Sequence, residues 1–226
     1  MAKFAKIIHK SNENFLINKF IGLFKRKIRI KGKRRFSLVL TGGKSPLKLY
    51  KNLAMEKDIP WKKIDFFLTD ERYVGENSKH SNINMCKKKF LNKMPISNKQ
   101  IYMMSVNKKK INKISEDYEN KIKKYFLGKK VAFDLVILGV GKDGHVASLF
   151  EENVLKKNKK IVDVVSRRDF SRITLTLKCL NNSKNIFLWV PGKGKLSIIK
   201  KIILDKGFNF PVSFINIKNK FLFYSN

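Results

Sequence analysis

The chain of 226 residues has few cysteines, few acidic residues and no long hydrophobic run. Its two cysteines, Cys86 and Cys179, lie far apart and have no His or Cys beside them. That pattern argues against a disulfide framework and against a cysteine-based zinc site. The longest apolar run, around Leu135 to Leu138, is far shorter than the roughly 18 to 20 residues of a membrane helix. Because the N-terminal residues also lack the apolar core of a signal peptide, we expect a cytoplasmic protein.

The scarcity of acidic residues leaves 51 Lys and Arg against 17 Asp and Glu, a formal net charge of +34. Such an excess is typical of nucleic-acid-binding proteins. However, the basic residues are spread along the whole chain, and only 8 of them are Arg, the better phosphate ligand. Lys, Asn and Ile make up 88 of the 226 residues, and their A/T-rich codons explain the charge without a ligand. We therefore expect no membrane partner and no specific nucleic acid, only non-specific RNA association and attraction of anionic substrates; an RNA-binding protein is the alternative.

Hydrophobic residues make up 43% of the chain and aromatic residues 12%, too many for a disordered protein. Because there is no internal repeat and no Pro- or Ser-rich linker, we expect a single domain over residues 1–226. Short apolar runs predict strands at 4–8, 36–40, 64–68, 133–138, 172–177 and 185–190. Helical patterns lie between them at 12–29, 46–57, 79–91, 109–127 and 193–205.

The alternation of strands and helices predicts an α/β fold, a doubly wound, mostly parallel open sheet with helices on both faces. In such sheets ligands bind at the carboxyl ends of the strands. The turns that follow the strands are therefore the places to look for chemistry.

The first informative turn is TGGKSP at residues 41–46, directly after the predicted strand 36–40. Gly42 and Gly43 let the backbone adopt positive φ and approach a ligand closely. Ser45 is expected as the N-cap and Pro46 as the first residue of the next helix. Free amides at that helix end, with Lys44 beside them, suit a phosphate group; an ordinary tight turn is the alternative.

The second turn carries three charges, Asp70, Glu71 and Arg72, at the end of the predicted strand 64–68. A carboxylate there suits a base or a partner for a substrate hydroxyl, and Arg72 suits a phosphate. A surface ion pair between Glu71 and Arg72 is the alternative.

The third turn, FDLVILGVGKDGHVASLF at 133–150, is the most informative, and we expect a short helix to follow it. Its glycines have the GxGxxG spacing of a dinucleotide site, but no acidic residue stands in a suitable sequence context about 20 residues on. Instead the turn presents His145 beside Asp143. Histidine is the side chain best suited to proton transfer near neutral pH, and an adjacent carboxylate fixes its tautomer. A helix cap or a core histidine is the alternative. Farther along, Arg172 and Lys195 taken singly are more typical of solvated surface than of a site.

Taken together, these pieces resemble the 6-phosphogluconolactonase family, which shares a superfamily with the glucosamine-6-phosphate deaminases. The resemblance spans about residues 36–205 and rests on motifs in matching order: TGGKSP at 41–46, DERYV at 70–74, Ser81-Asn82, LGVGKDGHVASLF at 138–150, RITLT at 172–176 and GKGK at 192–195. The chain departs from the family at Lys44 and Ser45, where Ser and Thr are usual, and at Val146, where Thr is usual.

The resemblance implies hydrolysis of 6-phospho-D-glucono-1,5-lactone to 6-phosphogluconate, in the oxidative pentose phosphate pathway, without a metal or an organic cofactor. It implies that His145 is the general base, that Asp143 orients it, and that Asp70 lines the sugar. The residues implied in phosphate binding are Gly42, Gly43, Lys44, Ser45, Arg72, Arg172 and Lys195.

The main alternative within the superfamily is a glucosamine-6-phosphate deaminase. Those enzymes resemble this chain but read DEY in place of DER, and they carry a Glu five residues after the His. The fifth residue after His145 is Phe150, which favours the lactonase.

Overall fold

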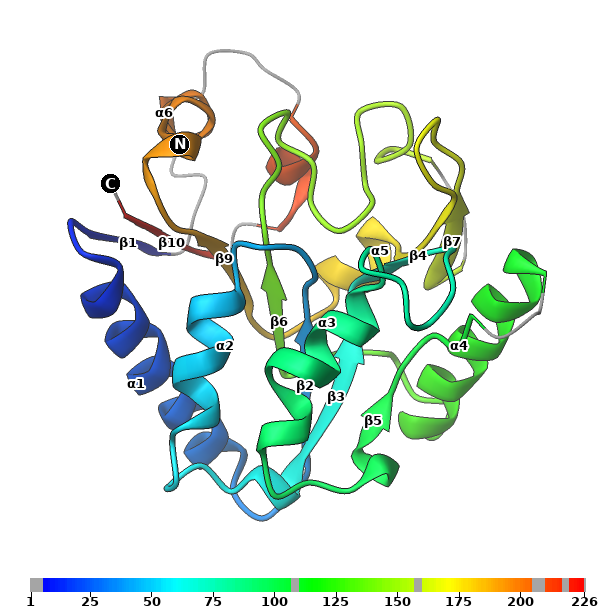
Figure 1. Cartoon of the computed structure of the whole chain (residues 1–226), viewed down its shortest axis with the longest axis horizontal. Helices are drawn as coiled ribbons and strands as arrows, with labels where there is room; N and C mark the ends of the chain where they lie inside the picture. The colour runs from blue at the N-terminus through cyan, green and yellow to red at the C-terminus, as the bar shows by residue number, and fades with distance from the viewer. Residues whose placement is uncertain (1–5, 107–109, 157–159, 205–209, 217–219, 226) are drawn as a thin grey trace.

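The computed structural model describes residues 6–106, 110–156, 160–204, 210–216 and 220–225. It contains a seven-stranded parallel sheet with the strand order β1-β10-β9-β6-β2-β3-β5 (Figure 1). In chain order its strands are β1 (Lys6–Lys10), β2 (Phe36–Leu40), β3 (Ile64–Leu68), β5 (Ile101–Tyr102), β6 (Leu135–Leu138), β9 (Ile186–Val190) and β10 (Lys220–Ser225). The prediction of a mostly parallel α/β sheet is confirmed, although residues 4 and 5 of the first predicted strand lie outside the described part.

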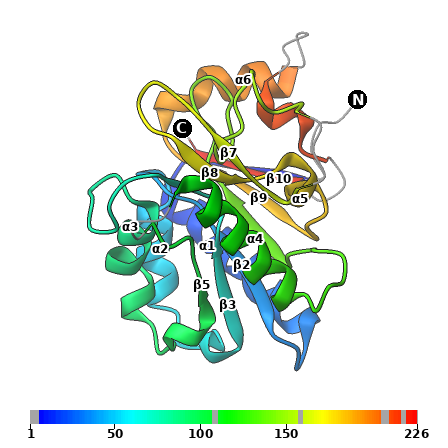
Figure 2. The same cartoon turned by 90° about the vertical axis from the view of Figure 1, so that its right-hand side faces the viewer.

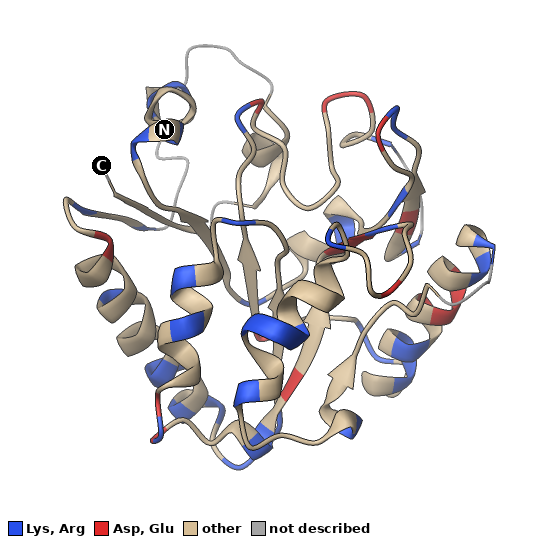
Figure 3. Ribbon diagram, in the orientation of Figure 1, with Lys and Arg blue, Asp and Glu red and all other residues tan. Residues whose placement is uncertain are grey.

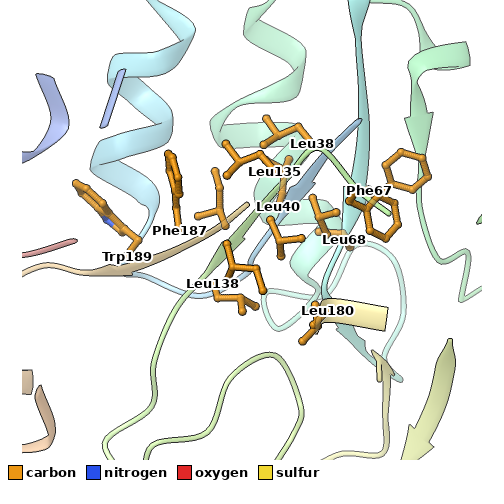
Figure 4. Packing of buried hydrophobic residues seen from close by; sticks show 14 of the residues in the cluster. Leu38, Leu40, Phe67, Leu68, Leu135, Leu138, Leu180, Phe187 and Trp189 are labelled. Carbon is orange, nitrogen blue, oxygen red and sulfur yellow. The ribbon is translucent and has the colours of Figure 1, made fainter. Parts of the chain in front are cut away.

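The central strands β2, β3, β6 and β9 are buried along their whole length. Because side chains alternate between the two faces of a strand, this burial requires cover on both faces of the sheet. Large side chains such as Phe187 and Trp189 fill the space on the sheet (Figure 4). The ring of Phe20, from the first helix, meets both of them edge-on, with centroid distances of 5.2 and 5.6 Å.

Six α-helices occur in the described ranges: α1 (Glu13–Lys31), α2 (Leu47–Ala54), α3 (Asn82–Lys89), α4 (Ile111–Tyr125), α5 (Leu177–Asn181) and α6 (Leu196–Leu204). Five of them match the predicted helical segments, although α1 extends past residue 29 and residues 109 and 205 are not described; α5 was not predicted. The first, α1, starts at Asn12, whose side chain accepts from the amide of Asn14, and it ends at Gly32, where φ is 67°. In space α1 packs on α2, and α2 on α3 (Figure 1).

A second, three-stranded antiparallel sheet was not expected. It consists of β4 (Asp70–Arg72), β8 (Arg172–Leu175) and β7 (Val162–Val165), in that order. Figure 1 labels β4, and Figure 2 labels β7 and β8. The predicted strand 172–177 therefore belongs to this sheet, and it ends at Leu175 because Thr176 caps α5. Helix α4 packs on β7 and β8.

Two local predictions were wrong. Ser45 is not a helix cap: α2 begins one residue later, after Pro46, without a side-chain cap, and the Ser45 hydroxyl instead accepts a hydrogen bond from Lys195. No helix follows the glycine-rich turn, because Gly144 and Ala147 adopt positive φ of 81° and 51°, which interrupts a right-handed helix. Residues 139–150 form successive turns instead.

The described helices include none that is long and apolar enough to cross a membrane. Cys86 and Cys179 are buried free thiols; burial raises the pKa of Cys86, and it raises that of Cys179 to about 12. Lys and Arg are distributed over helices and loops in many parts of the fold (Figure 3).

Asp134, just before β6, anchors the amino ends of the strands. Its buried carboxylate accepts from the amide and hydroxyl of Ser37 and from the ammonium groups of Lys31 and Lys184. Burial raises its pKa, but Lys31, Ser37 and Lys184 outweigh burial and hold the pKa below the ordinary value. We expect Asp134→Asn to lower the free energy of unfolding by about 2 kcal/mol at pH 7, measured by urea denaturation.

The sign of the pH effect follows from that lowered pKa. A carboxylate whose folded pKa is depressed stabilises the fold above its unfolded pKa and loses that contribution as the pH falls through the folded value. The difference in free energy of unfolding between wild type and Asp134→Asn should therefore become smaller below about pH 4. Asp58→Asn, which removes an exposed partner of Lys25, is the control and should change little. If the difference in free energy of unfolding between wild type and Asp134→Asn stays constant down to about pH 2, the ionised Asp134 carboxylate is not what stabilises the fold.

Candidate active site

A cavity of about 220 Å³ opens at the carboxyl ends of β2, β3, β6 and β9. Its walls come from the turn after β2, strand β4, the start of α3, the turn after β6 and the 3-10 turn before α6. The lining residues are Thr41, Gly42, Gly43, Lys44, Ser45, Asp70, Arg72, Asn82, Gly139, Val140, Gly141, His145, Ala147 and Lys195. The structure therefore brings together every predicted site residue except Asp143 and Arg172.

Asp143 does not line the cavity, but it holds His145. The two side chains meet with Nδ1 of His145 2.6 Å from Oδ1 of Asp143, and the His145 amide donates to the same oxygen at 3.3 Å. Partial burial raises the pKa of Asp143, but the charge and hydrogen bonds of His145 outweigh it, so the net pKa is below the ordinary value. With Nδ1 engaged by a carboxylate, Nε2 is the ring nitrogen suited to exchange a proton with a ligand.

Gly141 fits tightly against this pair. A Cβ at this position would lie 2.2 Å from Nδ1 of His145 and 2.5 Å from Oδ1 of Asp143. The Gly141 amide also donates to the carbonyl of His145 at 2.8 Å. Gly141 is one of the three glycines whose spacing mimics a dinucleotide site. Its lack of a side chain is explained by the space that His145 and Asp143 occupy.

The TGGKSP turn forms another part of the cavity lining. Gly43 adopts a φ of 83°, and a Cβ on Gly42 would lie 1.9 Å from the amide oxygen of Asn82. Lys195 reaches across from the start of α6, and its ammonium donates to the Ser45 hydroxyl at 3.2 Å. Burial, with a contribution from Lys142, lowers the pKa of Lys195. An anion at this wall would meet backbone amides and a desolvated cation.

Arg72 contributes a second cation from β4. Its NH1 donates to the carbonyl of His80 at 2.9 Å, while its buried Nε has no partner among the described residues. A buried donor without an acceptor is costly, so an anion that accepts from Nε would be stabilised at this position.

Glu71 has a role that the sequence reading missed. It is fully buried and accepts from the Ser81 hydroxyl and from the amides of Arg72, Asn82 and Ile83, which caps α3. Burial raises its pKa, against the lowering effect of these bonds. Glu71 therefore forms no surface ion pair; it fixes Asn82, whose side chain donates to the carbonyl of Asp70 at 2.9 Å. The Ser-Asn pair after DER was the available signal for this cap.

Asp70 is 6% exposed and lines the cavity with both carboxylate oxygens engaged. Oδ1 accepts from the hydroxyl of Thr69 at 2.7 Å, and Oδ2 from the hydroxyl of Ser148 at 2.8 Å. Thr69 and Ser148 were not expected at the site.

Arg172 is turned away from the cavity. Its guanidinium binds both carboxylate oxygens of Asp169, at 2.9 and 2.6 Å, and lies 5.5 Å from the ring centroid of Phe150. The Arg172 guanidinium strongly lowers the pKa of Asp169. Its predicted role in phosphate binding is not supported by this arrangement.

The described residues include no group of three or more His, Cys, Asp or Glu side chains arranged to hold a metal ion. The cavity is lined by His145, which is paired with Asp143, and by three cations, Lys44, Arg72 and Lys195, beside the backbone of the TGGKSP turn. Such an arrangement suits proton transfer on a small anionic ligand.

Comparison with known proteins gives consistent matches. Residues 13–223 match the family described as glucosamine-6-phosphate isomerases/6-phosphogluconolactonase. The chain is 33% identical over 194 residues to a 6-phosphogluconolactonase from Thermotoga maritima, covering 85% of this chain and 84% of that protein. A crystal structure of the T. maritima 6-phosphogluconolactonase superposes with a TM-score of 0.84 at 30% identity, over 97% of this chain and 98% of the other. A monomeric glucosamine-6-phosphate deaminase superposes with a TM-score of 0.81 at 18% identity, over 98% and 97% of the two chains, a likeness of fold alone.

Proposed function

Because the chain belongs to the glucosamine-6-phosphate isomerase/6-phosphogluconolactonase family, as its motifs predicted, we propose that it hydrolyses 6-phospho-D-glucono-1,5-lactone to 6-phospho-D-gluconate. This is a reaction of the oxidative pentose phosphate pathway. The observation that supports the proposal is that His145, held by Asp143, lines the same small cavity as the TGGKSP turn and the cations Arg72 and Lys195.

The phosphate is placed at the TGGKSP turn, where amides of Gly42 and Gly43 lie near the cations Arg72 and Lys195. Two fixed cations and preorganised amides bind a phosphate dianion without further reorganisation. Anchoring this end leaves the lactone ring to extend toward His145.

Hydrolysis then needs one base and one positioned water. Nε2 of His145 takes a proton from water as the water oxygen bonds to the lactone carbonyl carbon. The tetrahedral intermediate collapses, the bond from that carbon to the ring oxygen breaks, and the imidazolium returns the proton to the ring oxygen. The carboxylic acid formed loses its proton to solvent. Asp143 keeps the imidazole oriented and stabilises its charged form.

The deaminase alternative has weaker support. The fifth position after His145 is Phe150 rather than a carboxylate. In addition, both carboxylate oxygens of Asp70 already accept hydrogen bonds, from the hydroxyls of Thr69 and Ser148. An RNA-binding function would need basic and aromatic side chains gathered on one face, whereas Lys and Arg are spread over the fold (Figure 3).

The direct test is hydrolysis of freshly generated 6-phosphogluconolactone, followed as proton release above the protein-free rate. We expect the wild-type protein to accelerate opening of the lactone clearly. It should not accelerate deamination of glucosamine 6-phosphate, measured as ammonia release. A folded protein that matches the blank with the lactone would refute the proposal, and ammonia release would favour the deaminase.

A further inference from the structure

The turn that carries His145 needs support from outside itself. Residues 139–150 contain no helix, and Gly144 and Ala147 both adopt positive φ. Positive φ is strained for alanine and persists only where the surroundings hold it. Within the turn, Val146 and Leu149 exchange backbone hydrogen bonds of 3.4 and 2.9 Å, and the amides of Gly141 and Gly144 donate to the carbonyls of His145 and Gly141 at 2.8 and 3.1 Å. These bonds link the turn to itself and do not fix its position relative to the rest of the site.

Support from outside comes at Gly144, whose carbonyl accepts from the Val212 amide at 3.0 Å, and at Ser148, each of whose polar groups is hydrogen-bonded. Its hydroxyl donates to Oδ2 of Asp70 at 2.8 Å, and its amide donates to the hydroxyl oxygen of Thr174 at 3.2 Å. Its carbonyl accepts from the side chain of Asn153 at 3.2 Å. The residue is 1% exposed, so water does not compete for these bonds.

The second sheet explains why one serine reaches both partners. In the register of β4 and β8, Asp70 is paired directly with Thr174. Side by side, they present a carboxylate oxygen and a hydroxyl to the turn that leaves β6. Ser148 thereby links the His145 turn of the main sheet to the second sheet at the pair that includes Asp70.

We propose that Ser148 is a positioning residue: its hydroxyl ties the His145 turn to Asp70 and so sets where the imidazole stands relative to the substrate carbonyl. The proposal rests on the proposed lactone hydrolysis. Ser148 itself does not line the cavity and takes no proton from the substrate. Its effect should therefore fall on the chemical step rather than on phosphate binding.

The main variant is Ser148→Ala, which removes one hydroxyl and no packing volume beyond it. We expect kcat to fall about 30-fold with KM within about 3-fold, because a displacement of about 1 Å at a catalytic group costs rates of this order. Ser115→Ala, a buried serine of α4, is the matched control and should keep both constants. Thermal unfolding of both variants should follow wild type closely enough for assay at 25 °C.

The variant Thr69→Val tests whether the loss of activity comes from a displaced His145 turn or from the loss of any hydrogen bond to the Asp70 carboxylate. It removes the hydroxyl from the other oxygen of the same carboxylate but leaves the His145 turn tied. We expect a clearly smaller loss of kcat than for Ser148→Ala. An equal loss of kcat in Thr69→Val and Ser148→Ala would overturn the proposal. It would mean that the Asp70 carboxylate itself, and not the hydrogen bond that links it to the His145 turn, determines the rate. A Ser148→Ala kcat within about 3-fold of wild type would overturn it as well.

A readout without substrate keeps this proposal distinct from the proposed function. The ring C–H resonances of His145, assigned by their loss in His145→Asn, should move in Ser148→Ala and stay in place in Ser115→Ala. If wild type fails to accelerate lactone opening, the proposed function fails; unchanged His145 resonances in Ser148→Ala refute the tie itself.

Discussion

Replacing His145 by alanine or asparagine should reduce lactone hydrolysis above the blank by about 10³-fold in kcat, because general base catalysis contributes factors of this order. His145→Asn is the sharper variant, since an amide retains a polar group near Asp143 but accepts no proton from water. KM should change little, because the proposed phosphate-binding residues Arg72 and Lys195 are untouched. Initial rates of proton release at several lactone concentrations give both constants, with the spontaneous rate subtracted.

His9→Ala is the matched control, because His9 lies on β1 at the far edge of the sheet, stacked on Tyr224 with a centroid distance of 4.5 Å. It should leave kcat at the wild-type value. A His145→Asn enzyme with more than a tenth of wild-type kcat would remove the histidine from the base role, and the activity would then have to come from phosphate anchoring and electrostatics alone.

The placement of the site was predictable because it depends on local pattern. Continuous apolar runs marked β2, β3, β6 and β9 as strands buried on both faces. Parallel strands bring their carboxyl ends to one edge, so the turns at 41–46, 70–72 and 139–145 had to meet there. The pairing of His145 with Asp143 is a contact two residues apart, which sequence alone suggests.

The second sheet was not predictable in the same way. β4 is only three residues long and reads Asp-Glu-Arg, which has no strand pattern. It becomes a strand because it pairs with β8, about 100 residues away. The contacts of Ser148 with Asp70 and Thr174 follow from that pairing, so its role was not visible in the sequence. The Glu71 cap of α3 had only the Ser-Asn pair at 81–82 as its signal.

Arg172 shows how an expected ligand can be turned away by a local partner. Asp169, three residues earlier, offers two carboxylate oxygens in the geometry that a guanidinium prefers. Ser45 failed as a cap for a related reason, because its hydroxyl accepts from Lys195 across the cavity. Both cases depend on side-chain partners, which a motif does not specify.

Arg72→Met should raise KM for the phosphorylated lactone by about 30-fold, since a charge-assisted hydrogen bond is worth about 2 kcal/mol. Arg72 lines the cavity with a buried, unpartnered Nε, and methionine fills similar space without charge. Because His145 and Asp143 remain paired, kcat should fall much less than KM rises. Steady-state rates with 6-phosphogluconolactone and with unphosphorylated glucono-1,5-lactone give the comparison.

The unphosphorylated lactone is what makes this test specific. If Arg72 binds phosphate, the variant should lose efficiency only toward the phosphorylated substrate, and kcat/KM for glucono-1,5-lactone should stay near the wild-type value. Arg34→Met removes one exposed positive charge at the amino edge of the sheet and controls for the +34 field. Equal losses in Arg72→Met and Arg34→Met would mean that long-range attraction draws in the substrate. Equal losses toward both lactones would place Arg72 in the support of β4 rather than at the phosphate.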